Sequence, residues 1–187
     1  MKQWLPLCLA LALSACSSTS ELTYYQLPTP VQAVLQSASQ AGAPQLWIDQ
    51  VRIPDYLAEN GLVYQTTDVQ YSIATQNLWA SPLDQQLRST LAANLSARLP
   101  GWIVSSQPLG NEQSVLSVEV TDFYGRYDGH VIVSGEWLLN QQGTLIKRPF
   151  YIDLKQQQDG YDAMVKVLAQ GWQQAATQIA AQLERLP

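Results

Sequence analysis

Residues 115–154 read VLSVEVTDFYGRYDGHVIVSGEWLLNQQGTLIKRPFYIDL, and three amphipathic segments follow one another along this stretch. Apolar and polar residues alternate in 115–122, which is the pattern of a strand with one buried face. Residues 131–139 repeat this alternation and residues 145–154 provide a third run, with glycine-containing turns in between. Because short connections join antiparallel neighbours, the stretch predicts a three-stranded antiparallel meander.

Two segments flanking the meander have the periodicity of amphipathic helices. In residues 81–99, leucines recur at every fourth position before Pro100. In residues 159–186, apolar residues recur at steps of three and four. Ser81 and Asp159 are the expected N-terminal caps. Each predicted helix can therefore place one apolar face on a sheet.

Shorter apolar runs predict further strands at residues 23–27, 46–53, 62–67, 69–74 and 102–104. The alternation slips near Asp49–Gln50, which predicts a β-bulge there. Along the chain, strands are followed by a helix, the meander and a second helix. This order predicts an α/β fold, a single-domain sandwich with a mixed, mostly antiparallel sheet packed against two amphipathic helices.

The first residues are typical of a bacterial export signal. Lys2 precedes an apolar run at 5–13 that is too short to cross a bilayer. The run ends in Leu13-Ser14-Ala15-Cys16, which resembles the lipobox of bacterial lipoproteins. In such proteins the signal is removed and the cysteine, as the new N-terminus, receives lipid. The pattern predicts cleavage directly before Cys16.

This cleavage divides the chain into a signal peptide (1–15), a lipidated flexible tether (16–22) and one folded domain (23–187). Cys16 is expected to carry S-diacylglycerol and an N-acyl group, and two or more acyl chains make membrane anchoring stable. In enterobacterial sorting, aspartate directly after the lipidated cysteine retains a lipoprotein in the inner membrane. Ser17 holds that position here. The expected location is therefore the periplasmic face of the outer membrane.

Composition argues against several classes of function. The formal charge is -5 at pH 7, and removal of Lys2 with the signal makes it -6. Lysine and arginine do not cluster, which disfavours nucleic acid as a partner. Cys8 leaves with the signal and Cys16 is consumed by lipid, so no disulfide or cysteine-based site is expected. His130, the single histidine, is expected in a solvated turn, and phosphate-binding or activated-serine motifs are missing from the sequence. We therefore expect no enzymatic activity, metal or other cofactor.

Aromatic residues are abundant, with six tryptophans and nine tyrosines. Trp137 and Trp172 lie on periodic apolar faces and are expected in the core. Tyrosine and tryptophan outside such faces are favourable anchors for protein interfaces. Each such aromatic residue could alternatively be part of the hydrophobic core. The candidate partner contacts, all in segments that resemble loops, are Tyr56, Trp79, Tyr124 and Tyr127.

Several segments together resemble the ABC-type transport auxiliary lipoproteins. They are Pro54–Leu57, Asn77–Leu83, Leu99–Pro100, the turn Gly125–Gly129 with the strand 131–139, and Asp159–Asp162. The resemblance covers essentially the whole chain, with residues 23–187 as the family's domain. It implies an outer-membrane lipoprotein that docks a periplasm-spanning protein built of mammalian-cell-entry domains. An inner-membrane component would be an indirect partner, and the system would move lipids between membranes and support envelope integrity.

Two other functions stay open on the residues alone. A periplasmic carrier that holds lipid itself would require a large apolar cavity. An envelope hydrolase would require a buried cluster of groups with perturbed pKa values. For a docking protein, a ring-shaped homo-oligomer is the simplest arrangement around the end of a symmetric tube, because heterologous contacts close under cyclic symmetry.

Overall fold

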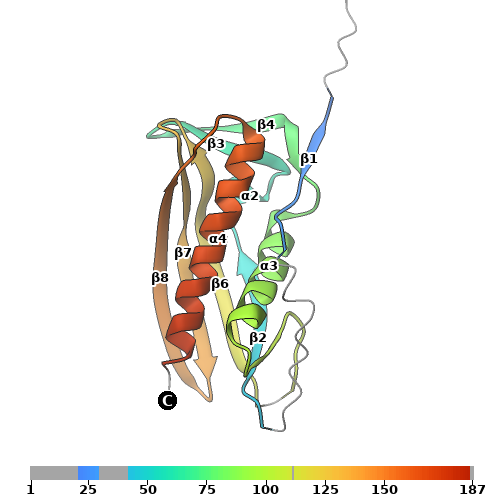
Figure 1. The fold of residues 1–187 in the computed structure, drawn as a ribbon, viewed down its shortest axis with the longest axis vertical. Coiled ribbons are helices and arrows are strands. Elements are labelled where there is room, and N and C mark those ends of the chain that lie inside the picture. The colour runs from blue at the N-terminus through green and yellow to red at the C-terminus, as the bar shows by residue number, and fades with distance from the viewer. Residues whose placement is uncertain (1–20, 30–41, 111, 186–187) are drawn as a thin grey trace, which may run out of the picture.

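The computed structural model describes residues 21–29, 42–110 and 112–185. Figure 1 shows one sheet with two long helices on one of its faces. The elements are β1 (Thr23–Tyr25), β2 (Gln45–Arg52), α2 (Asp55–Ala58), β3 (Gly61–Thr67), β4 (Gln70–Trp79), α3 (Leu83–Arg98), β5 (Ile103–Ser105), β6 (Ser114–Arg126), β7 (His130–Gln141), β8 (Thr144–Lys155) and α4 (Tyr161–Leu183). The predicted α/β sandwich with two amphipathic helices is confirmed. The predicted signal peptide and the anchor residues Cys16 and Ser17 lie outside the described residues.

The sheet is organised around β6, the longest strand. On one side β6 pairs with β7 in antiparallel fashion, and β8 continues the predicted meander. On its other side β6 pairs in parallel with β2 and, at its far end, with β3. β4 is antiparallel to β3, while β1 and β5 add parallel edges. The sheet is therefore mixed, its longest pairings are antiparallel, and the predicted bulge in β2 is present between Ile48 and Gln50.

The core lies between the sheet and the two helices. The leucine stripe of α3 is buried, and Leu87, Leu91 and Leu95 are all fully enclosed. α4 packs on β7 and β8, and Gly171 lets it approach closely. A Cβ atom at Gly171 would lie 2.8 Å from Cγ2 of Val133. The two long helices therefore leave the opposite face of the sheet uncovered.

The described part of the chain contains no helix that is long and apolar enough to cross a membrane.

Candidate partner-binding surface

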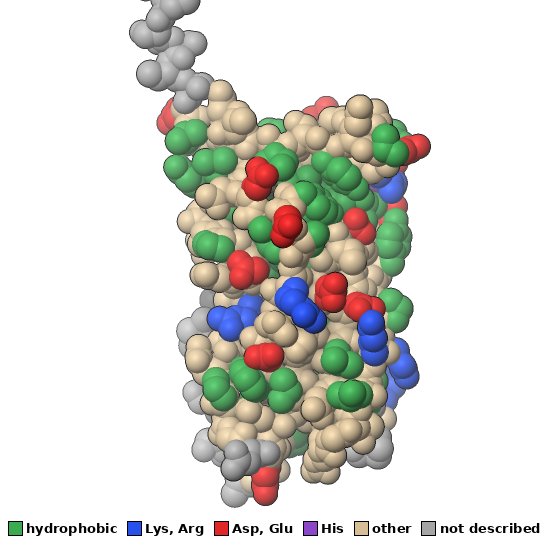
Figure 2. All heavy atoms as spheres, turned by 180° about the vertical axis from the view of Figure 1, so that it is seen from behind, with side chains coloured by type: hydrophobic (Ala, Val, Ile, Leu, Met, Phe, Trp, Pro, Cys, Tyr) green, Lys and Arg blue, Asp and Glu red, His purple; other side chains and the backbone are tan. Residues whose placement is uncertain are grey.

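The uncovered face of the sheet is seen in Figure 2, from the side opposite the helices. Apolar side chains gather in its upper half, and a band of acidic and basic side chains crosses below them. The ion pairs of the described residues include Arg52 with Glu119 at 3.9 Å and Lys147 with Glu136 at 2.5 Å on this face. Both pairs are solvent-exposed, so they contribute little to stability and mainly define the surface charge.

Three tyrosines from separate elements form a cluster on this face, which we call the tyrosine cluster: Tyr56, Tyr71 and Tyr124. The ring centroid of Tyr71 is 5.2 Å from that of Tyr56 and 5.1 Å from that of Tyr124. Tyr71 is 43% exposed and Tyr124 only 7%. The hydroxyl of Tyr56 donates a 2.7 Å hydrogen bond to the backbone carbonyl of Thr121. Packed rings held by a hydrogen bond are rigid, which lowers the entropy lost on binding.

Burial is the main reason that the pKa values of Tyr56 and Tyr124 lie well above the ordinary value for tyrosine. The nearby Asp122 carboxylate raises both pKa values further. Asp122 itself accepts a hydrogen bond from the hydroxyl of Ser134, and Ser134 lies 2.7 Å from the hydroxyl of Thr121. The hydroxyls of Tyr56 and Tyr124 therefore remain protonated, and that of Tyr56 keeps its hydrogen bond to the carbonyl of Thr121.

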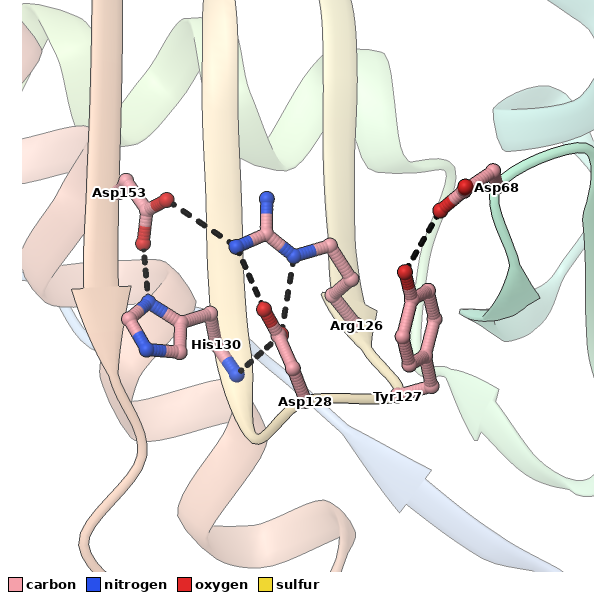
Figure 3. Close-up of polar contacts among 6 residues, drawn as sticks. All are labelled: Asp68, Arg126, Tyr127, Asp128, His130 and Asp153. Carbon is pink, nitrogen blue, oxygen red and sulfur yellow. Dashed lines mark hydrogen bonds and ion pairs between the residues drawn. The ribbon is translucent and has the colours of Figure 1, made fainter.

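The turn between β6 and β7 is held by a polar network, drawn in Figure 3. Arg126 donates from Nε and Nη2 to the two carboxylate oxygens of Asp128, at 2.9 and 2.8 Å. Nη2 of Arg126 also donates a 3.3 Å hydrogen bond to one carboxylate oxygen of Asp153 on β8. The other Asp153 oxygen is hydrogen-bonded to Nδ1 of the His130 ring. The Arg126 guanidinium lowers the pKa of Asp128 to about 2. His130 is the first residue of β7 rather than a turn residue, and its partly exposed ring is hydrogen-bonded to Asp153.

Tyr127 joins two turns that are distant in sequence. Its hydroxyl donates a 2.6 Å hydrogen bond to Asp68 in the β3–β4 turn (Figure 3). This bond is the main cause that raises the pKa of Tyr127. The tips of both hairpins are consequently held side by side.

Within the described residues, no group of three His, Cys, Asp or Glu side chains is arranged to hold a metal ion. The carboxylates of Asp128 and Asp153 are paired with Arg126 or His130. Tyr56 and Tyr124, whose pKa values are raised, lie near Asp122, which accepts a hydrogen bond from the hydroxyl of Ser134. This group of residues includes no histidine, lysine or cysteine, so it lacks the base that usually activates a serine in a hydrolase.

Several hollows of about 240 to 340 Å³ open on the surface. The most apolar in character, about 310 Å³, lies below the β6–β7 turn between Tyr64, Arg126, Tyr161 and Met164. Each is open to solvent and includes polar or charged side chains in its lining. They differ from the enclosed apolar cavity that a lipid carrier would use.

The four aromatic candidates do not form one site. Tyr56 and Tyr124 lie in the tyrosine cluster, but on α2 and β6 rather than in loops as predicted, and Tyr127 lies at the hairpin tip. Trp79 is only 4% exposed and packs on Phe123, with ring centroids 6.1 Å apart. The loop-like reading of its segment was wrong, because Trp79 ends β4 and faces the core. Sequence reasoning missed Tyr71, which lies on β4 opposite Gln65 of β3.

Comparison with known proteins gives a match over most of the chain. The family described as "ABC-type transport auxiliary lipoprotein component" matches residues 25–180. The intermembrane transport lipoprotein PqiC of Escherichia coli strain K12 is 62% identical over 188 residues, which covers 100% of both chains. The protein of the same name from Shigella flexneri has the same identity and coverage.

Solved structures share the fold. A crystal structure of an uncharacterized protein has a TM-score of 0.80 and 62% sequence identity, covering 87% of this chain and 99% of the other. A crystal structure of a Xanthomonas campestris protein has a TM-score of 0.65 at 14% identity, covering 84% of this chain and 92% of the other. At that identity the second likeness supports the fold alone.

Proposed function

The chain belongs to the family of ABC-type transport auxiliary lipoprotein components, and from this we propose that it is the outer-membrane lipoprotein of a PqiABC-type intermembrane lipid transport system. The observation that carries the proposal is the 62% identity over the full length to proteins named intermembrane transport lipoprotein PqiC. The protein would act without catalysis, by docking the transport conduit at the outer membrane and thereby supporting membrane integrity.

The proposed attachment to the membrane is lipid on Cys16. The lipobox before Cys16 supports it, and so does membership of a family described as lipoproteins. Ser17 in place of aspartate supports transfer to the outer membrane. A tether of a few residues would then leave the folded domain in the periplasm, close to the bilayer surface.

The proposed direct partner is PqiB, the periplasm-spanning protein with mammalian-cell-entry domains, and PqiA of the inner membrane is an indirect one. The uncovered sheet face is the surface that suits PqiB. It offers the rigid tyrosine cluster, where Tyr71 is exposed and Tyr56 and Tyr124 support it from below. Aromatic side chains with this support are the usual anchors of protein interfaces. A ring of copies would present this face repeatedly to a symmetric tube.

The carrier function is the alternative, and no observation in the described residues favours it. Its cargo would require an enclosed apolar space, whereas the hollows found are open and partly polar.

Capture of PqiB from detergent-solubilised envelopes tests the docking function. We expect the wild-type chain to retain PqiB and Tyr71→Ala to weaken the association by about 2 kcal/mol or more. Gln174→Ala is the control, because Gln174 is exposed on α4, on the opposite face of the molecule. Equal melting temperatures of the variants would show that the fold is intact. Equal capture by all three proteins would reject the tyrosine cluster as the docking site, and no capture by the wild type would reject PqiB as partner.

A further inference from the structure

The hairpin formed by β3 and β4 is almost free of charge. Between Gly61 and Trp79 the only charged residue is Asp68. In the described structure β1 covers β4 only at Asn77–Trp79, so the edge of β4 at residues 70–76 carries no neighbouring strand. Exposed strand edges ordinarily carry charges or proline, which discourage association. An uncharged edge of this length therefore indicates a surface that is normally covered.

Strand β8 provides the comparison within the same molecule. Among the described strands it pairs with β7 alone, so its outer edge is open as well. It contains Lys147, Arg148 and Pro149 near its middle, which is the usual protection of an edge. The β4 edge, of comparable length, contains no lysine, arginine or proline.

The location of the β3–β4 hairpin indicates what covers it. In Figure 1 the hairpin lies across the end of the molecule where β1 begins, together with the β6–β7 turn. The β7–β8 turn and the end of α4 lie at the opposite end. β6 connects the two ends, and its 13 residues span about 43 Å at roughly 3.3 Å per residue.

The length of the N-terminal segment restricts which end can meet a membrane. Glu21, the first described residue, follows Cys16 by five residues. A fully extended chain covers at most about 3.5 Å per residue, or roughly 18 Å over this segment. Lipid on Cys16 would therefore hold the β1 end, rather than the β7–β8 turn, close to the bilayer.

Apolar side chains are exposed at this same end. Leu22 is 50% exposed, Tyr24 60%, Val69 85% and Tyr127 49%. Val69 lies at the tip of the β3–β4 hairpin, and the bond from Tyr127 to Asp68 occupies the one carboxylate of that hairpin. Tyrosine and aliphatic side chains are favoured at the level of lipid headgroups, where one part of the side chain is apolar and another is hydrated.

We infer that this end, with Leu22, Tyr24, Val69 and Tyr127, rests in the headgroup region of the bilayer that holds the anchor. The inference rests on the proposed lipidation of Cys16. A nearly uncharged hairpin suits a zwitterionic phospholipid surface, because it offers no cation to attract anionic headgroups. In this orientation the uncovered sheet face does not contact the bilayer, so it remains accessible to a protein partner in the periplasm.

Site-specific labelling of the full-length protein tests this orientation. The processed chain has no free thiol if Cys16 is lipidated, so Val69→Cys or Leu145→Cys provides a single attachment point for a nitrobenzoxadiazole dye. Leu145 is the matched control, since it is 64% exposed at the β7–β8 turn. The labelled proteins are reconstituted on vesicles of phosphatidylcholine and phosphatidylethanolamine, and flotation confirms attachment. We expect the dye at position 69 to shift its emission to the blue and to be quenched by nitroxide-bearing lipid, and the dye at position 145 to show neither effect.

The outcomes separate the two proposals. If the protein floats but both labels remain in water, the orientation is overturned while the anchor stands. If the protein does not float, the anchor and the orientation fail together. Complete disulfide linkage of the unlabelled Val69→Cys protein to a second copy on the vesicles would show that a second copy covers the hairpin, which also overturns the inference. A Tyr24→Cys label repeats the test from β1 should the Val69 variant fold poorly, with circular dichroism as the check on folding.

Discussion

The indole Nε1 of Trp172 donates a 3.1 Å hydrogen bond to the backbone carbonyl of Leu87, and this bond joins α4 to α3 in the core. The Trp172 side chain is 1% exposed and that of Leu87 is fully buried. α3 covers β2 and β5, whereas α4 covers β7 and β8. The bond therefore connects the two halves of the helical layer above a sheet that they share.

Truncation of the leucine stripe should destabilise the domain. Leu91→Ala leaves a cavity at a fully buried position, so we expect the free energy of unfolding to fall by about 2–5 kcal/mol. Gln174→Ala, at an exposed position of α4, should change it by no more than about 0.5 kcal/mol. Denaturant titration measures both. A near-neutral Leu91→Ala would contradict the packing described for α3.

Gly171→Ala tests the close approach of α4 to the sheet. Alanine favours a helix by about 1 kcal/mol over glycine, but the new Cβ would lie 2.8 Å from Cγ2 of the stiff Val133 side chain. Overpacking typically costs about 1–3 kcal/mol, so we expect net destabilisation. Val133→Ala removes the methyl group that would clash. Gly171→Ala should therefore destabilise the Val133→Ala protein less than it destabilises the wild type. Thermal and denaturant unfolding of the four proteins would show this coupling, and purely additive effects would argue against the contact.

The helices and the meander were predictable because their signals are local. Where one face of a strand or helix is buried, apolar residues recur in the sequence at every second position or at steps of three to four. The bulge at Asp49–Gln50 was also predictable, because the alternation slips there. The N-terminal caps were predicted incorrectly. The cap positions are Pro82 and Gly160, without a side-chain hydrogen bond, while the side chain of Gln86 donates to the carbonyl of Ser81.

Strand partners and most of the surface site depend on contacts between distant residues. No local pattern indicates that β2 and β3 pair in parallel with the two ends of β6. Trp79 resembled a loop residue because Ser81–Pro82 follows closely, yet pairing with β1 extends β4 to its end. The tyrosine cluster arises only when α2, β4 and β6 come together, so Tyr71 could not be selected from sequence spacing.

The ion pair in the β6–β7 turn should give a specific dependence on pH. The pKa of Asp128 is about 2 in the fold, below its ordinary value of 3.8. Folding thus favours the ionised carboxylate, and the stabilisation is present above about pH 3.8 and disappears as the pH falls toward about 2. We expect wild type to melt above Asp128→Asn near neutral pH, and the gap to close across this acid range. A gap that does not change with pH would show that the charge is not responsible.

Loss of the hydroxyl of Tyr127 should release the β3–β4 tip without unfolding the domain. Tyr127→Phe removes the hydrogen bond to Asp68, while the ring remains. Because the site is exposed, we expect global stability to change by less than about 0.5 kcal/mol. Hydrogen exchange at residues 67–70 should nevertheless become faster. Tyr24→Phe is the control, because Tyr24 is an exposed tyrosine on β1. Equal exchange at the tip in both variants would mean that the hydrogen bond does not hold the two hairpins together.

The sorting of the proposed lipoprotein should depend on the residue after Cys16. Ser17→Asp places an aspartate where enterobacterial sorting retains lipoproteins in the inner membrane. We expect the wild type to fractionate with outer-membrane markers on a sucrose gradient and Ser17→Asp with inner-membrane markers. Ser17→Ala controls for loss of the serine itself and should follow the wild type.

Cys16→Ala should remain unprocessed or unanchored, because it removes the site of lipid attachment. Mass spectrometry of the wild-type N-terminus should find a lipidated cysteine, and an unmodified Cys16 or cleavage at another position would refute the anchor on which this sorting depends.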